Sequence, residues 1–182
     1  MKSIHPEWAR VRRAEKMFLG STSPSAPLTE VESEAIIRCR VTKECARDFR
    51  LLLERKGVWQ GGPCFGVRAN GELRLQAARP GGPRPLLSAS DDPFALHPGY
   101  VLGLSDMLDP IQYDWRAHWI AAPDSLPPED LLRWADEGLK RGLVDDEYPL
   151  IGVGRDRDGL SYWAVIWRAE DSTWQDLPIV RS

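Results

Sequence analysis

The chain has little cysteine, little histidine and no long apolar run, and each of these absences narrows what the protein can be. Its three cysteines show no CxxC spacing, so neither a disulfide framework nor a zinc ribbon is indicated. No stretch of about 18 apolar residues occurs, which a membrane-spanning helix would need. The N-terminal residues also lack the apolar segment of a secretion signal. We therefore expect a reduced, cytoplasmic protein that has no membrane partner.

An excess of positive charge is missing as well. The 24 Lys and Arg residues are outnumbered by 27 Asp and Glu residues, which gives a formal net charge of −3. Proteins that bind the phosphate backbone of nucleic acids use basic surfaces. We therefore expect no nucleic-acid partner.

Tryptophan, in contrast, is abundant, with eight residues in a chain of 182. Four of them fall on expected strands and suit a core: Trp115, Trp119, Trp163 and Trp167. The other four lie outside the expected core faces, and exposed indoles are enriched in protein interfaces. We predict that one or more of these four bind a partner: Trp8, Trp59, Trp134 and Trp174.

The length suits one domain with appendages. Residues 1–35 are interpreted as an N-terminal arm and linker, because the stretch 20–27 (GSTSPSAP) is small, polar and proline-containing. Residues 36–170 are expected to form the domain, and residues 171–182 a polar C-terminal tail.

The first half of the domain is predicted to contain a helix and a hairpin. Thr42 is a suitable N-cap for a helix that runs to Lys56, with four apolar residues on one face: Cys45, Phe49, Leu52 and Leu53. The dipeptide Asn70-Gly71 is a strong hairpin signal. Short strands are expected over 35–41, 63–68, 72–78 and 100–104, and an irregular loop over 80–98.

The second half centres on the stretch 115–142. Three prolines between 124 and 128 end any regular element there. The elements expected around this bend are a strand over 117–122, a helix with Leu131, Ala135 and Leu139 on one face, and a closing hairpin of strands over 150–154 and 161–167. Together the elements predict an α+β fold, with helices packed on a mainly antiparallel or mixed sheet.

The order of these elements and three local signatures resemble the JAB/MPN metalloprotease domain (the JAMM family of zinc isopeptidases). The first signature is GGPCFG (Gly61–Gly66) after a helix, where the family has Glu-x-Gly-Gly-x-Leu-x-Gly. The second is HWIAAPDSLPPEDL (His118–Leu131), where the family has a strand ending Trp-His-x-His-Pro and then Ser-x-x-Asp. The third is the closing strand pair PLIGVGRDRDGLSYWAVI. The resemblance covers residues 36–170 and implies a JAB/MPN-like sheet flanked by helices.

The resemblance also implies where a metal site would lie, and there the sequence departs from the family. The family holds zinc with two histidines and an aspartate, and uses a glutamate as general base and a serine near the oxyanion. The matching positions here are Ile120 and Ala122 for the histidines, Asp130 for the aspartate, Trp59 for the base and Pro127 for the serine. Isoleucine and alanine donate no electron pair, and a catalytic zinc normally has three protein ligands. Asp130 also has a structural interpretation, because the start of a helix favours a carboxylate.

Two alternative sites, built from residues outside the family's ligand positions, stay open. His118 lies two residues before the first histidine position, and strand alternation would place both on the same face. It could join His97 and Asp130 in an unorthodox metal site, or join Cys64 and Asp130 as the base of a nucleophilic triad. The alternatives are a surface loop histidine for His97 and a core thiol for Cys64.

We therefore predict a non-catalytic JAB/MPN-like module for protein binding or complex assembly, without a cofactor. Its partner would be a ubiquitin-like protein or a subunit of a larger assembly. The alternative is an active zinc-dependent isopeptidase or peptidase with displaced ligands, namely His118, Asp130 and His97. A third interpretation is an α+β domain unrelated to that family.

Overall fold

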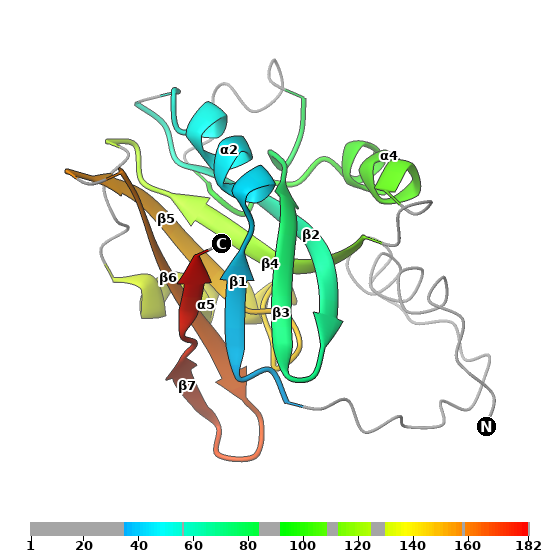
Figure 1. The fold of residues 1–182 in the computed structure, drawn as a ribbon, viewed down its shortest axis with the longest axis vertical. Helices are drawn as coiled ribbons and strands as arrows, with labels where there is room; N and C mark the ends of the chain where they lie inside the picture. Colours follow the sequence, from blue (N-terminus) through cyan, green and yellow to red (C-terminus); the bar gives the residue numbers. More distant parts are fainter. Residues whose placement is uncertain are drawn as a thin grey trace.

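The fold is known from a computed structural model, which describes residues 35–55, 57–83, 92–108, 113–124, 130–157 and 159–181 (Figure 1). Within these ranges the chain forms three helices and eight strands. The helices are α2 (Lys43–Leu52), α4 (Pro98–Leu108) and α5 (Leu131–Lys140). The strands are β1 (Arg38–Val41), β2 (Gln60–Ala69), β3 (Glu72–Ala78), β4 (Asp114–Ala121), β5 (Leu150–Asp156), β6 (Gly159–Arg168), β7 (Thr173–Asp176) and β8 (Ile179–Arg181). The prediction of an α+β fold is confirmed.

All eight strands belong to one mixed sheet, in the order β7-β6-β5-β4-β2-β3-β1-β8. The pairs β1–β3, β1–β8 and β4–β5 are parallel, and the other neighbours are antiparallel. Only Leu177 and Pro178 separate the two edge strands, β7 and β8, along the chain. The Leu177 N–H donates to the Ala164 carbonyl of β6, and the Pro178 carbonyl accepts from the Cys39 N–H of β1, both at 2.8 Å. The sheet is therefore curled so that its two edges lie side by side (Figure 1).

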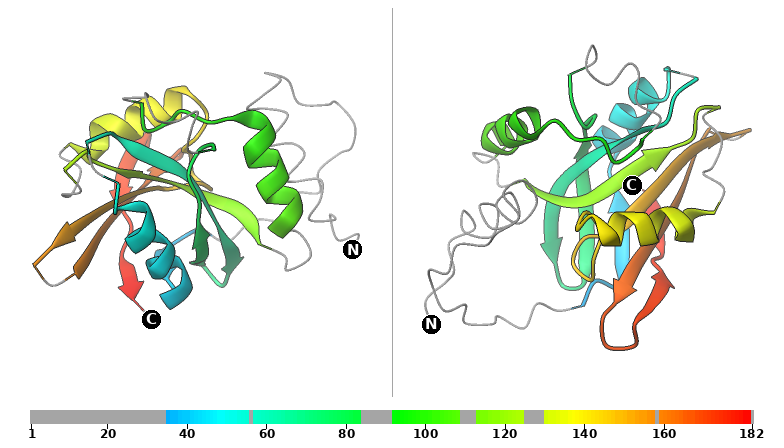
Figure 2. Two further views of the ribbon diagram at one scale, coloured as in Figure 1. Left: turned by 90° about the horizontal axis from the view of Figure 1, so that it is seen from above. Right: turned by 180° about the vertical axis from the view of Figure 1, so that it is seen from behind.

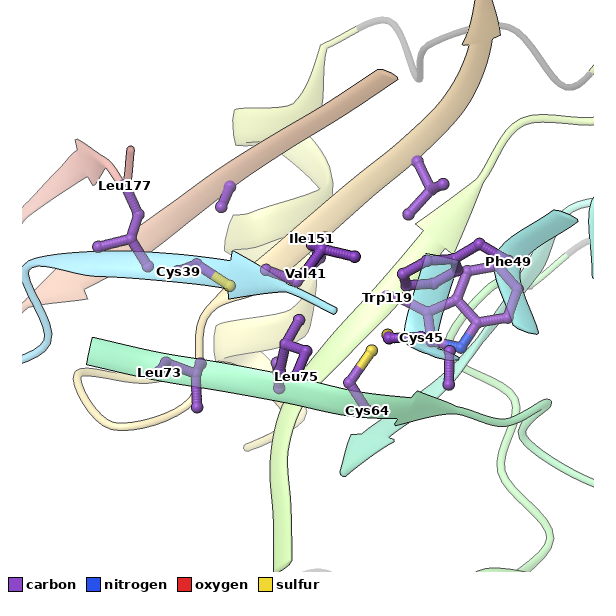
Figure 3. Close-up of a cluster of buried hydrophobic side chains, with 14 of the residues drawn as sticks. Cys39, Val41, Cys45, Phe49, Cys64, Leu73, Leu75, Trp119, Ile151 and Leu177 are labelled. Carbon is purple, nitrogen blue, oxygen red and sulfur yellow. The ribbon is translucent and has the colours of Figure 1, made fainter. Parts of the chain in front are cut away.

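Helices cover both faces of the curled sheet, with α2 on one face and α4 and α5 on the other (Figure 2). The face under α2 carries a buried cluster that includes Phe49, Trp119 and Ile151 (Figure 3). The opposite face carries a second buried cluster, with Phe65 and Val165 packed near Ala135 of α5. The two predicted helix faces therefore pack on opposite sides of the sheet.

The predicted helix faces are confirmed in part. Phe49 and Leu53 of the first helix face are fully buried, as is Ala135 of the second. Leu52, Leu131 and Leu139 are only half-buried.

A helix cap and a turn show how the local sequence sets these elements. The Thr42 hydroxyl accepts a hydrogen bond from the Cys45 N–H at 3.3 Å, as expected of an N-cap. Asn70 (φ 52°) and Gly71 (φ 68°) both adopt the left-handed backbone of a type I′ turn between β2 and β3. The N-cap and the turn are confirmed, but α2 ends at Leu52, before the predicted end at Lys56.

The prediction of a strand over 100–104 is wrong, because these residues belong to α4. Val101, Leu104 and Leu108 are buried at helical spacing, a periodicity that so short a stretch does not reveal. The Tyr100 N–H also donates to His97 Nδ1 at 3.2 Å, which caps the helix start.

The residues after 170 also differ from the expected polar tail, since they supply both edge strands of the sheet. The pairing of β8 with β1 joins distant parts of the chain, and no local pattern records it. Residues 1–34 of the expected arm (1–35), with Trp8, lie outside the described residues, as do residues 84–91 of the expected loop. No described helix is long and apolar enough to cross a membrane.

Candidate functional site

The strand register brings together two of the segments in which the resemblance places a metal site. β2 and β4 are antiparallel neighbours, with Gln60 opposite Ala121. Trp59 directly precedes β2 and therefore lies beside the end of β4. Ile120 and Ala122, which match the two histidine positions, lie at that same end, the first fully buried and the second half-buried.

Aromatic side chains occupy this corner of the domain. The ring centroid of Trp59 lies 4.6 Å from that of Trp134 in α5, and Trp134 lies 6.1 Å from Phe94. Phe94 in turn packs against His118 of β4 at 5.0 Å. We call these four residues the aromatic cluster. Its two indoles are half-buried, whereas Phe94 and His118 are buried, so the indoles form the accessible part of the cluster.

The segment that carries Phe94 is held against the sheet by a close backbone approach. A Cβ placed on Gly61 would lie 2.0 Å from the Pro93 carbonyl oxygen, so only glycine fits there. Asp92 forms an ion pair with Arg141 at 2.6 Å, and the Arg141 guanidinium lies 5.5 Å from the Phe94 ring. These contacts fix the aromatic cluster between β2, β4 and α5.

The surface beside Trp59 is hollowed only slightly. The hollow has a volume of about 40 Å³, which has room for a few water molecules. Its lining consists of Arg55, Trp59, Gln60, Gly61, Pro80, Asp92, Ala95 and Trp119. Among the residues that the structure describes, this corner is therefore a contact surface with a shallow hollow.

The structure does not bring together His97, His118 and Asp130, the three residues of the alternative metal site. Across the part of the chain that the structure describes, no three His, Cys, Asp or Glu side chains lie close enough to hold one metal ion. His118 is fully buried, and its Nε2 donates to the Pro93 carbonyl at 3.2 Å. His97 is exposed before α4 and Asp130 is exposed before α5. The three side chains thus lie in separate surroundings.

Cys64 and His118 point to opposite faces of the sheet. Cys64 belongs to the buried cluster under α2 and lies opposite Ala117 in the strand pair. The next residue of β4, His118, packs against Phe94 on the other face, because successive strand residues alternate. Burial also raises the pKa of the Cys64 thiol well above its usual value, which disfavours the thiolate form. This geometry excludes a Cys64–His118 nucleophile and base pair.

Asp130 is the N-cap residue of α5, yet its side chain makes no capping hydrogen bond. Its backbone is left-handed, with φ 56° and ψ 51°, whereas a capping side chain normally requires an extended backbone. Asp130 therefore stands at the helix start, as its structural interpretation predicts, but its carboxylate does not cap the helix. Pro127, which matches the family's serine, lies outside the described residues.

The remaining tryptophans divide between core and surface. Trp174, a predicted partner-binding residue, is half-buried and packs against Trp167 at 5.1 Å between ring centroids. Trp115 and Trp119 are buried as predicted, but Trp163 is 40% exposed and Trp167 is only half-buried.

Sequence reasoning did not identify Trp163 as an exposed residue or Phe94 as a member of the aromatic cluster. Trp163 shares a strand face with Val165, which is buried in the cluster with Ala135 of α5. The alternation of side chains along the strand predicted that Trp163 and Val165 share a face. It does not show how far along that face the helix α5 extends. Phe94 lies in a loop without periodicity, so no sequence pattern indicated its contacts with His118 and Trp134.

No family model and no curated protein matches this chain. Among solved structures, the chain is similar to the solution structure of protein DSY2949 from Desulfitobacterium hafniense, with a TM-score of 0.55. The two share 11% sequence identity, and the match covers 79% of this chain and 92% of that chain. At this identity the likeness concerns the fold alone.

Proposed function

We propose that this chain is a non-catalytic, JAB/MPN-like domain that binds another protein through the aromatic cluster. The observation that carries the proposal is the 4.6 Å contact between Trp59 and Trp134. In the resemblance to the JAB/MPN family, Trp59 matches the position of the general base of the active enzymes. Its indole packs on the helix that follows Asp130, so an aromatic contact fills the position that a water-activating carboxylate would need.

The order of elements supports the family part of the proposal. α2 precedes the β2–β3 hairpin, α5 follows β4, and the β5–β6 hairpin comes next, as the resemblance implies. The pairing of β2 with β4 also gives the base and histidine positions a shared corner.

The chemistry of the matching positions favours binding over hydrolysis. The side chains of Ile120 and Ala122 have no lone pair to offer a metal ion. The indole nitrogen of Trp59 only donates a hydrogen bond, so it cannot accept a proton from a bound water. Asp130 alone does not make a catalytic zinc site, which normally needs three protein ligands.

The accessible part of the aromatic cluster suits a protein partner. Leu132 of α5, the helix that carries Trp134, is 49% exposed, and the Arg133 guanidinium lies 5.8 Å from the Trp134 ring. Trp and Arg are among the residues that contribute most to protein interfaces. A ubiquitin-like protein or a subunit of a larger assembly is the partner we propose.

The test compares three alanine variants of the full chain, each purified from its native cells after crosslinking. Trp59→Ala and Trp134→Ala remove the indoles of the cluster, and Trp163→Ala removes an exposed indole outside it as a matched control. We expect the same captured protein with wild type and Trp163→Ala. The purified partner should bind Trp59→Ala and Trp134→Ala about tenfold or more weakly, while circular dichroism shows unchanged folding.

Equal binding by all three variants would place the interface away from the aromatic cluster. Near-stoichiometric zinc in protein purified without a chelator, together with cleavage of an isopeptide bond to a ubiquitin-like protein, would favour a zinc-dependent isopeptidase instead.

A further inference from the structure

A second concave site lies where α2 meets the strands at the closing edges of the sheet. A groove of about 190 Å³ opens there, and it shares no lining residue with the hollow beside Trp59. One face of α2 lines it, with Lys43, Ala46 and Arg50. The ends of β1, β6 and β8 complete the lining with Val41, Gly159, Leu160, Tyr162 and Arg181. We call this site the α2–β8 groove.

The α2–β8 groove is cationic in a chain whose net charge is negative. Lys43, Arg50 and Arg181 line it, and none of the described residues that line it is Asp or Glu. Two residues of the lining have a carboxylate residue next to them in the sequence: Glu44 beside Lys43, and Asp158, outside the described residues, beside Gly159. Glu44 is engaged at the helix start. Hydrogen bonds with its own backbone N–H and with the Thr42 side chain lower the pKa of Glu44. The described lining of the groove is therefore a concentration of positive charge.

The rest of the lining is apolar and partly aromatic. The Tyr162 ring packs against Phe49 at 5.8 Å, and the Arg181 guanidinium lies 5.5 Å from the Tyr162 ring centroid. Burial raises the pKa of Tyr162 to about 12. Its phenol, which is neutral at pH 7 even at the ordinary pKa of about 10, can donate a hydrogen bond. A Cβ on Gly159 would meet nothing within 4 Å, so this end of the groove is open.

We propose that the α2–β8 groove binds a small phosphomonoester, with Lys43, Arg50 and Arg181 around the phosphate group. The apolar side chains and the Tyr162 ring would contact the organic part of the ligand.

Charge and size decide this class of ligand. A phosphomonoester carries nearly two negative charges and three acceptor oxygens at pH 7, which matches three cationic side chains better than a singly charged carboxylate does. Guanidinium groups also bind phosphate through two parallel hydrogen bonds. The volume is below the range of about 300–1,000 Å³ that drug-sized ligands occupy, so the ligand is small.

The first experiment titrates the full chain at low ionic strength with phenyl phosphate, inorganic phosphate and benzoate, followed by NMR chemical shifts. We expect saturable binding of phenyl phosphate, weaker binding of inorganic phosphate because it lacks the ring, and benzoate about tenfold weaker than phenyl phosphate because it has less charge. An absence of saturation by phenyl phosphate at millimolar concentrations would overturn the proposal. Benzoate binding as tight as that of phenyl phosphate would overturn it too.

The second experiment locates the binding. Arg50→Gln and Arg181→Gln should each weaken phenyl phosphate binding about tenfold or more. Arg47 lies on the same helix, is exposed and does not line the groove, so Arg47→Gln is the control and should change binding less than about twofold. An equal loss in Arg47→Gln would show non-specific attraction and reject the site.

A further variant leaves the three cations in place. Ala46→Leu narrows the groove, so it should weaken phenyl phosphate binding more than inorganic phosphate binding. An unchanged affinity for phenyl phosphate in this folded variant would contradict the assignment even where an arginine variant fails to fold.

Discussion

The rings of Phe49 in α2 and Trp119 in β4 meet edge to face, with centroids 5.5 Å apart and an interplanar angle of 74°. Both side chains are buried in the cluster drawn in Figure 3. This geometry is favourable for aromatic pairs beyond the area that they bury. The contact ties α2 to one of the central strands of the sheet.

Phe49→Ala should therefore lower the free energy of unfolding by about 3–5 kcal/mol, through lost burial and a residual cavity. Leu51 lies on the same helix but is 51% exposed, so Leu51→Ala should stay within about 0.5 kcal/mol of wild type. Urea denaturation at neutral pH measures both. Similar losses in the two variants would mean that the burial of α2 is assigned to the wrong face.

Glu72 should make the protein sensitive to acid. The side chains of Arg40, Arg74 and Arg38 donate to its carboxylate, at 2.9, 3.1 and 2.7 Å respectively. The hydrogen bond from Arg40 is the main cause that lowers the pKa of Glu72 to about 2, against the opposing effect of desolvation. Because an unfolded Glu has a pKa of about 4.3, this contribution to stability is complete above pH 4.3. It is lost as the pH falls toward 2.

The matching experiment compares urea denaturation of wild type and Glu72→Gln from pH 7 down to the acid limit of folding. The deficit of Glu72→Gln relative to wild type should be constant at neutral pH and should shrink below about pH 4.3. Glu170 is exposed, so Glu170→Gln serves as the control and should follow wild type throughout. A deficit of Glu72→Gln that stays the same at low pH would argue against the proposed role of the arginines.

Two glycine substitutions should have opposite effects. In Gly61→Ala the new Cβ would lie 2.0 Å from the Pro93 carbonyl oxygen, so the loop at Pro93 must shift and thermal stability should fall. In α4, a Cβ on Gly103 would meet nothing within 4 Å, and Gly103→Ala should stabilise the helix by up to about 1 kcal/mol. Melting temperatures test both, and an unchanged value for Gly61→Ala would show that the loop does not lie against β2.

The thiols should be inert in the folded protein. Cys39, Cys45 and Cys64 are free and fully buried, and burial raises the pKa of the Cys39 and Cys64 thiols. Intact-mass measurements after iodoacetamide treatment should show no label on these residues in native protein and three labels in urea. Rapid labelling of Cys64 in native protein would restore it as a candidate nucleophile.

The parts of this fold that could be predicted from the sequence are those determined by neighbouring residues. Thr42 and the Asn70-Gly71 turn set their own backbone, so α2 and the β2–β3 hairpin follow from a few adjacent residues. The strand pairing of β1 with β8 depends on segments that are remote in the chain, and no local pattern encodes it.

The distinction between local and long-range determinants also applies to the aromatic cluster and the α2–β8 groove. The sequence identified Trp59 and Trp134 one by one as partner-binding candidates, and their mutual contact follows from the tertiary fold. The three cations of the α2–β8 groove come from α2 and from β8. Their convergence requires the curled sheet, so composition and spacing could not reveal it.

The parallel pairing of β1 with β8 has a consequence for how the protein is made. β8 is synthesised after every other described strand, yet Cys39 of β1 lies opposite Ile179 of β8. Until β8 emerges from the ribosome, the outer backbone groups of β1 have no strand to pair with. An unpaired strand edge can pair with another chain, so a nascent chain that stalls before β8 should be prone to aggregate or to need a chaperone.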